Sequence, residues 1–230
     1  VLRDYNGDVH IIGADEEIRI AHPNDLLARS DWSSWQRECF TAERIQPFVD
    51  LGERLGMFIA QMNEAQAQSI GVRFYGELAT ARKELIVNAV LTGLLNATLS
   101  GSVTLVNARS VANERGIEVT ESTSTRSRNY ASLISVELQT AAGQRWVEGT
   151  VFEKSGPRLV LVDGIGVEAP LEGTMIVMRN LDQPGVIGDV GTILGRHGVN
   201  IATFALGRGA DGAVGVVIVD ETAPIPDSVL

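Results

Sequence analysis

The sequence predicts an α/β protein of the α+β type, with helices gathered early and an antiparallel sheet late. Apolar residues recur at helical spacing between residues 48 and 62 and between 85 and 95. Three β-type runs then follow between residues 117 and 152, two of them joined by a turn at Ala142-Gly143-Gln144. From residue 174, a β-type run, a helix and two further β-type runs indicate a second, smaller domain.

Residues 1–40 match no pattern that we recognise. Residues 8–12 and 18–20 are candidate short strands, and the packing of this segment stays open. From Thr41 the composition changes. We expect a helix there that Pro47 starts or restarts, because proline fits the first turn of a helix.

Residues 41–170 are interpreted as one domain. Thr80 is a candidate N-cap for the helix that carries Leu85, and Gly116 ends a short helix over residues 107–115. The expected strands cover residues 72–78, 117–123, 133–140, 145–152 and 158–162.

Residues 171–230 form the second predicted domain. A strand over 174–181 leads to a helix that Pro184-Gly185 opens and His197-Gly198 closes. Two strands follow, at 200–206 and 213–220. Residues 226–230 begin a second helix, and the chain stops before a last strand.

The bulk composition excludes several classes of function. A net charge of −10 opposes a nucleic-acid surface, which needs clustered Lys and Arg. No apolar run approaches the roughly 20 residues that span a bilayer, so no membrane partner is expected. The single cysteine, Cys39, fits a reducing compartment, and we expect a cytoplasmic protein.

Two glycine patterns resemble dinucleotide fingerprints, at Gly164–Ala169 and Gly207–Gly212. Pro170 interrupts the helix that the first would need, and a β-type run follows the second. We interpret both as turns that join strands, so no cofactor is expected in this chain.

Catalytic candidates are few. His10, His22 and His197 show no metal-ligand spacing, and no activating base accompanies Cys39. No catalytic residue and no metal ligand are predicted.

A polar cluster surrounds the start of the helix at Pro184. Its first N–H groups lack partners and, with the helix dipole, favour a carboxylate. Asp182 offers a charge for an ammonium, and Asn180 or Asn200 offers amide groups. The residues alone favour the simpler interpretation that Asp182 and Asn200 cap or turn the chain.

Residues 174–201 (TMIVMRNLDQPGVIGDVGTILGRHGVNI) closely resemble the ACT regulatory domain of D-3-phosphoglycerate dehydrogenases. Residues 41–170 resemble the intervening allosteric domain of the longer form of that enzyme. The motifs that carry this second likeness are PFVDLGERLG (47–56), LVNA (105–108), ERGI (114–117), GTVF (149–152) and RLVLVDG (158–164).

The resemblance implies a ferredoxin-like ACT fold, truncated before its last strand, in the regulatory portion of an NAD-dependent enzyme of serine biosynthesis. The parent enzyme would oxidise 3-phosphoglycerate and would carry NAD in domains that are absent here. By resemblance, the ACT domain senses L-serine through Asn180, Asp182 and Asn200, with backbone contacts from Gly185 and Val186. Asn180 stands where some members have His or Tyr.

The sequence bears on two other functions. A free-standing ACT sensor of amino acids remains the alternative. A subunit of serine dehydratase is disfavoured, because the chain lacks the cysteines that an iron-sulfur cluster needs.

The resemblance also implies an anion site in the intervening domain. Arg158 fits a basic position of that site, whereas Gly166 and Pro170 stand where further basic residues are expected. Arg126 and Arg128 could compensate.

The unpaired strand edges of an incomplete ACT unit favour a homo-oligomer, most simply a dimer through ACT sheets.

Overall fold

The computed structural model describes most of the chain, with side chains from Ile45 onward. The chain divides into two compact units, Val1–Gln46 and Pro47–Leu230. The described residues are 2–3, 9–12, 17–20, 32–63, 65–76, 78, 83–99, 102–124, 129–152, 156–210, 212–219 and 225.

The first unit contains a small antiparallel sheet of β1 (Leu2–Arg3), β2 (Val9–Ile12) and β3 (Glu17–Ile20). The two candidate strands in this segment are therefore confirmed. The expected helix start is wrong: α2 (Trp32–Gln61) begins well before Pro47 and contains it. No glycine or other proline interrupts residues 32–46, and Pro47 removes only one backbone donor.

The second unit is built on a six-stranded sheet in the order β5-β4-β6-β7-β8-β9. Its strands are β4 (Ala67–Gly76), β5 (Glu118–Ser124), β6 (Ser132–Thr140), β7 (Gly143–Phe152), β8 (Gly156–Val162) and β9 (Ile165–Pro170). The sheet is mixed and not wholly antiparallel as expected, because β4 pairs in parallel with β5. The helices α3 (Lys83–Thr98) and α4 (Ala108–Glu114) supply the crossover that a parallel pair requires.

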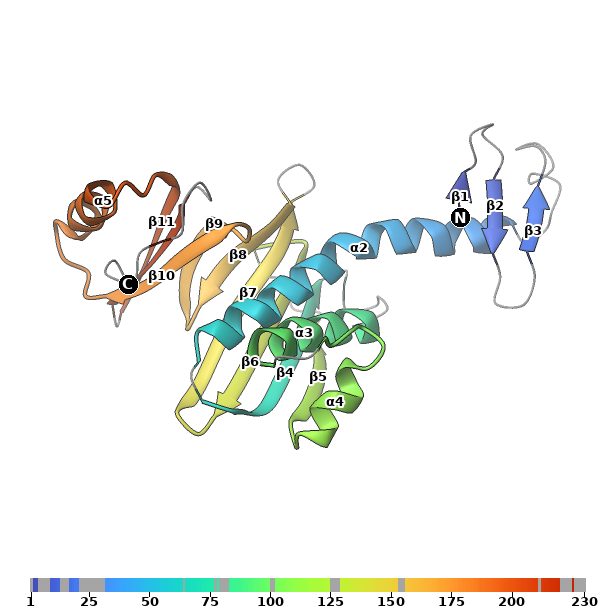
Figure 1. Ribbon diagram of the computed structural model, residues 1–230. Helices are drawn as coiled ribbons and strands as arrows, with labels where there is room; N and C mark the ends of the chain where they lie inside the picture. Colours follow the sequence, from blue (N-terminus) through green and yellow to red (C-terminus); the bar gives the residue numbers. More distant parts are fainter. Residues whose placement is uncertain are drawn as a thin grey trace. The chain divides into compact units, whose positions relative to one another are not determined.

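The part of α2 from Pro47 onward and helix α3 lie on one face of this sheet (Figure 1). A Cβ built on Gly149 of β7 would lie 2.7 Å from Leu51 Cδ1 and 3.1 Å from Leu55 Cδ1, so α2 packs directly on that strand. Gly56, the residue after Leu55 on the same helix, lies so close to α3 that its Cβ would be 2.0 Å from the Val90 carbonyl oxygen. The main hydrophobic core of this unit therefore lies between α2, α3 and the sheet.

The remaining strands form a second sheet in the order β10-β12-β11, antiparallel at both pairings. The elements are β10 (Thr174–Asn180), α5 (Val186–Arg196), β11 (Ile201–Gly209) and β12 (Gly212–Val219), and they confirm the four that the sequence predicts. Leu194 of α5 packs on Val217 and Val219. Pro184 lies just before the N-cap residue Gly185 and not inside the helix as expected. The expected helix at residues 226–230 lies outside the described residues.

Strand β9 replaces the turn expected at Gly164–Ala169. Only Asp163 and Gly164 form the turn, and from Ile165 the side chains alternate between buried and exposed. The second glycine pattern also lies mostly in strands, since β11 extends through Gly209. Strand β9 contacts β11 and β12.

In the part of the chain that the structure describes, no helix is both long and apolar enough to cross a membrane.

Candidate functional site

The predicted polar cluster occupies the loop between β10 and α5. Asn180 ends β10, Asp182 lies in the loop, Gly185 is the N-cap of α5 and Val186 is its first residue. Gly185 has a φ of 100°, which a glycine adopts without steric cost, and it offers no side chain to cap the helix. The first N–H groups of α5 therefore have no side-chain cap.

Of the two polar atoms in the Asn180 side-chain amide, one has a hydrogen-bond partner and the other has none among the described residues. Its Nδ2 donates to the Leu181 carbonyl oxygen at 2.7 Å. Its Oδ1 is buried and has no hydrogen-bond partner among the described residues. A buried acceptor without a donor costs free energy, and a ligand that donates a hydrogen bond there would remove that cost.

Asp182 already has a cationic neighbour. The Arg208 Nε lies 3.2 Å from the Asp182 Oδ1, and the two side chains are 69% and 43% exposed. Sequence reasoning missed Arg208, because it lies within a glycine pattern that we interpreted as a turn. The strand register explains the contact: Arg208 on β11 and Asn180 on β10 both lie opposite Ala213 of β12, which runs between them.

Asn200 is the predicted site residue that the fold separates from the others. It directly precedes Ile201, which pairs with Val219 at the far end of β12 from Ala213. At a rise of about 3.3 Å per residue, the two ends of β12 are roughly 20 Å apart. Within one chain the cluster therefore unites Asn180, Asp182, Gly185 and Val186 with Arg208, and it leaves Asn200 outside.

The predicted anion residue, Arg158, lies half-buried on β8. Its guanidinium carbon is 5.6 Å from the centroid of the Phe152 ring, and Tyr130 packs against the same ring at 6.2 Å. The Nε of Arg158 is buried with no hydrogen-bond partner among the described residues. Pro170 pairs directly opposite Arg158 and adds no charge. Arg126 and Arg128 lie outside the described residues.

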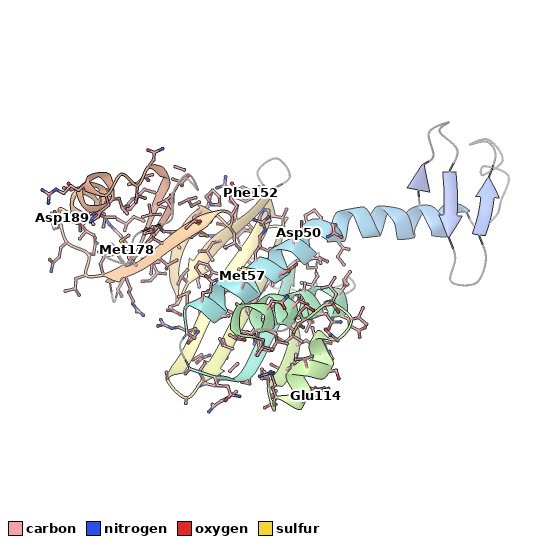
Figure 2. All side chains as sticks on the ribbon, viewed as in Figure 1. Asp50, Met57, Glu114, Phe152, Met178 and Asp189 are labelled. Atoms are coloured by element: carbon pink, nitrogen blue, oxygen red, sulfur yellow. The ribbon has the colours of Figure 1, made fainter. Side chains whose placement is uncertain are left out.

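A cavity of about 980 Å³ lies between the second half of α2 and strand β10. We call it the methionine cavity, because the four methionines of the chain all line it: Met57, Met62, Met175 and Met178. Figure 2 shows Met57 on α2 and Met178 on β10. Unbranched thioether side chains adapt their packing easily, so these walls can change shape at little cost.

Asp163 is one of several charged residues that line the methionine cavity. Its carboxylate accepts from Arg145 Nη1 at 2.7 Å and from the Trp146 backbone N–H at 3.1 Å. Arg179 Nη1, on β10, lies 3.8 Å away. This carboxylate therefore bridges β7 and β10.

The comparisons with known proteins agree with this architecture. The family model described as the D-3-phosphoglycerate dehydrogenase intervening domain matches residues 44–163, and the model of the ACT domain matches residues 174–229. Residues 164–173 lie between the two matches and include strand β9, the last strand of the six-stranded sheet.

The curated proteins that resemble this chain are named D-3-phosphoglycerate dehydrogenase, as in the description of the first family model. The chain is 33% identical over 189 residues to the D-3-phosphoglycerate dehydrogenase of Archaeoglobus fulgidus, which covers 80% of the chain and 36% of that protein. It is 32% identical over 191 residues to that of Mycobacterium leprae, with 81% and 36% covered. The protein of Methanocaldococcus jannaschii is 31% identical over 187 residues, with 81% and 35% covered.

The chain spans about a third of the length of these relatives. The matched part contains the intervening and ACT domains and corresponds to the two sheets of the second unit. The chain therefore belongs to the D-3-phosphoglycerate dehydrogenase family, of which it carries the regulatory domains.

Proposed function

We propose that this chain senses L-serine through its ACT domain and is the regulatory portion of an NAD-dependent D-3-phosphoglycerate dehydrogenase of the cytoplasm. One observation carries the proposal: Asn180, with its buried acceptor atom, and the acidic Asp182 lie beside a helix start that has no side-chain cap. The family name supports a role in serine biosynthesis, because the resemblance implies that 3-phosphoglycerate is the precursor of serine in that pathway. Serine would act as a feedback inhibitor.

The site must offer a partner to each of the two charges of an amino acid. Its ammonium would donate to Asp182 and to the buried Oδ1 of Asn180, and both groups are acceptors. The N–H groups near Gly185 and Val186 would receive another polar group of the ligand. The first turn of α5 also carries Asp189, whose Oδ2 lies 4.0 Å from a Cβ built on Gly185, and its charge opposes a carboxylate there.

Titration calorimetry with L-serine, glycine and L-alanine tests this function. Serine should bind the wild-type chain, and Asp182→Ala should weaken it about ten- to a hundredfold, the effect of losing a charged hydrogen bond. Glu114→Ala, an exposed carboxylate on α4, is the control and should bind serine normally. Absence of heat with wild-type protein, or equal binding by Asp182→Ala, would refute the site.

The position of Asn200 supports a homo-oligomer. A residue roughly 20 Å along the sheet from Asn180 can join the site only from a second copy of the chain. We therefore propose a dimer through the ACT domains, in which Asn200 of one copy completes the site of the other. Sedimentation that gives a monomer at micromolar concentration, with and without serine, would contradict this.

Two further expectations belong to the same proposal. Arg158, whose buried Nε has no hydrogen-bond partner in the described part of the chain, would hold an anion in the intervening domain. No NAD would bind this chain, because almost all of the first glycine pattern lies within strand β9, and strand β12, not a helix, follows the second. NADH fluorescence that changes on addition of the purified chain would contradict the second expectation.

A further inference from the structure

We propose that Arg208 is the carboxylate-binding residue of the ACT site, and that an α-amino acid binds by inserting between Arg208 and Asp182. The inference rests on the proposed function of this site and names the group that makes it selective for amino acids. This role replaces the expectation that the N–H groups near Gly185 and Val186 bind the carboxylate.

The strand order brings the pair together. Strands β10 and β11 run parallel on either side of β12, and Asn180 and Arg208 are at the same level on them, opposite Ala213. The loop after Asn180 then carries Asp182 towards β11, where Arg208 Nε meets its carboxylate at 3.2 Å. The ion pair therefore lies at the same end of this sheet as Asn180 and its buried acceptor atom.

Separating the Arg208–Asp182 ion pair also costs little free energy. Both side chains are substantially exposed, at 69% and 43%, and an exposed ion pair contributes little to stability because water screens it. A zwitterion can replace each partner with its own opposite charge. The ligand ammonium takes the place of the guanidinium at Asp182, and the ligand carboxylate takes the place of Asp182 at the guanidinium.

A guanidinium suits this exchange better than the helix start does. Its planar fork of donors binds a carboxylate through two parallel hydrogen bonds. The N–H groups of α5 have Asp189 in the same first turn, so a second negative charge is less favourable there. The α5 N-terminus would then receive the serine hydroxyl. The site should therefore discriminate against amines that lack a carboxylate.

The test compares L-serine with ethanolamine, which keeps the ammonium and hydroxyl but has no carboxylate, by calorimetry on the full chain. Arg208→Met keeps the aliphatic stem and removes the charge. Arg196→Met is the matched control, since Arg196 is an exposed arginine at the end of α5. Arg208→Lys keeps the charge without the fork, and thermal unfolding of each variant checks the fold.

Arg208→Met should weaken L-serine about ten- to a hundredfold relative to Arg196→Met. Ethanolamine should bind that variant as well as or better than wild type, because Asp182 has lost its competitor. Arg208→Lys should fall between. Equal serine affinity in Arg208→Met and Arg196→Met, or an equal loss for both ligands, would overturn the role of Arg208 while leaving serine sensing intact. If the wild-type chain binds no amino acid, the proposed function fails, and this inference fails with it.

Discussion

Gly207 on β11 and Gly166 on β9 meet backbone against backbone. A Cβ built on Gly207 would lie 2.2 Å from the Gly166 carbonyl oxygen, closer than any real side chain comes. Each glycine belongs to one of the two patterns that resemble a nucleotide fingerprint. Their shared feature is thus a close approach of two strands, one from each sheet, which only glycine permits.

Replacing Gly207 by Ala should separate these strands and cost about 1–3 kcal/mol of the free energy of unfolding, as overpacking does. Gly195→Ala on α5 is the control, because nothing lies within 4 Å of its Cβ and alanine favours a helix. Urea unfolding of the two variants measures the difference. Equal stability of Gly207→Ala and wild type would show that the strands do not touch.

A similar contact joins α2 and α3. Gly56→Ala would place its Cβ 2.0 Å from the Val90 carbonyl oxygen, so the helices must move apart. We expect a loss of about 1–3 kcal/mol in urea unfolding. Gly188→Ala, with open space around its Cβ on α5, should not destabilise the chain. A neutral Gly56→Ala would contradict the crossing that the structure describes.

How far the sequence predicts the molecule depends on whether a feature is local. The loop from Asn180 to Val186 could be predicted because strand end, loop and helix start are continuous in sequence. Arg208 could not, since only the register across β12 brings it beside Asp182. The same register separates Asn200 from the loop. Strand β9 was missed although residues 165–169 alternate, because the glycines of the pattern and Pro170 suggested a turn.

Asp163 should matter by its conformation as well as its charge. It has a φ of 48°, which Asn tolerates and Ala does not. Asp163→Asn should cost about 1 kcal/mol, since the Arg145 partner is partly exposed and screened. Asp163→Ala should cost about 1–2 kcal/mol more, because it adds backbone strain. Urea unfolding at low and high salt measures both, and 1 M salt should reduce only the charge-dependent part. Equal losses in the two variants would contradict this division.

Tyr130 should make alkaline stability depend on pH. Burial, and then the charge of Glu168, raise the pKa of its phenol above the ordinary value of 10.0. Because the folded pKa exceeds the unfolded one, this contribution to stability is complete below about pH 10 and is lost as pH rises through the folded pKa.

Glu168→Gln should lower the pKa of Tyr130 but leave it raised, since burial is the larger cause. Tyrosinate absorbance during an alkaline titration measures this, with Tyr130→Phe identifying the step that belongs to Tyr130. Identical titrations of wild type and Glu168→Gln would remove Glu168 as a cause.

The placement of the four methionines has a spectroscopic consequence. Because Met57, Met62, Met175 and Met178 all line one cavity, a sample labelled with ¹³C only at methionine methyl groups has its labels at one location. Two of these labels lie on α2 and its end, and two on the strand that ends at Asn180. Four resonances thus follow the relative movement of α2 and β10 directly, without a fluorophore or an engineered probe.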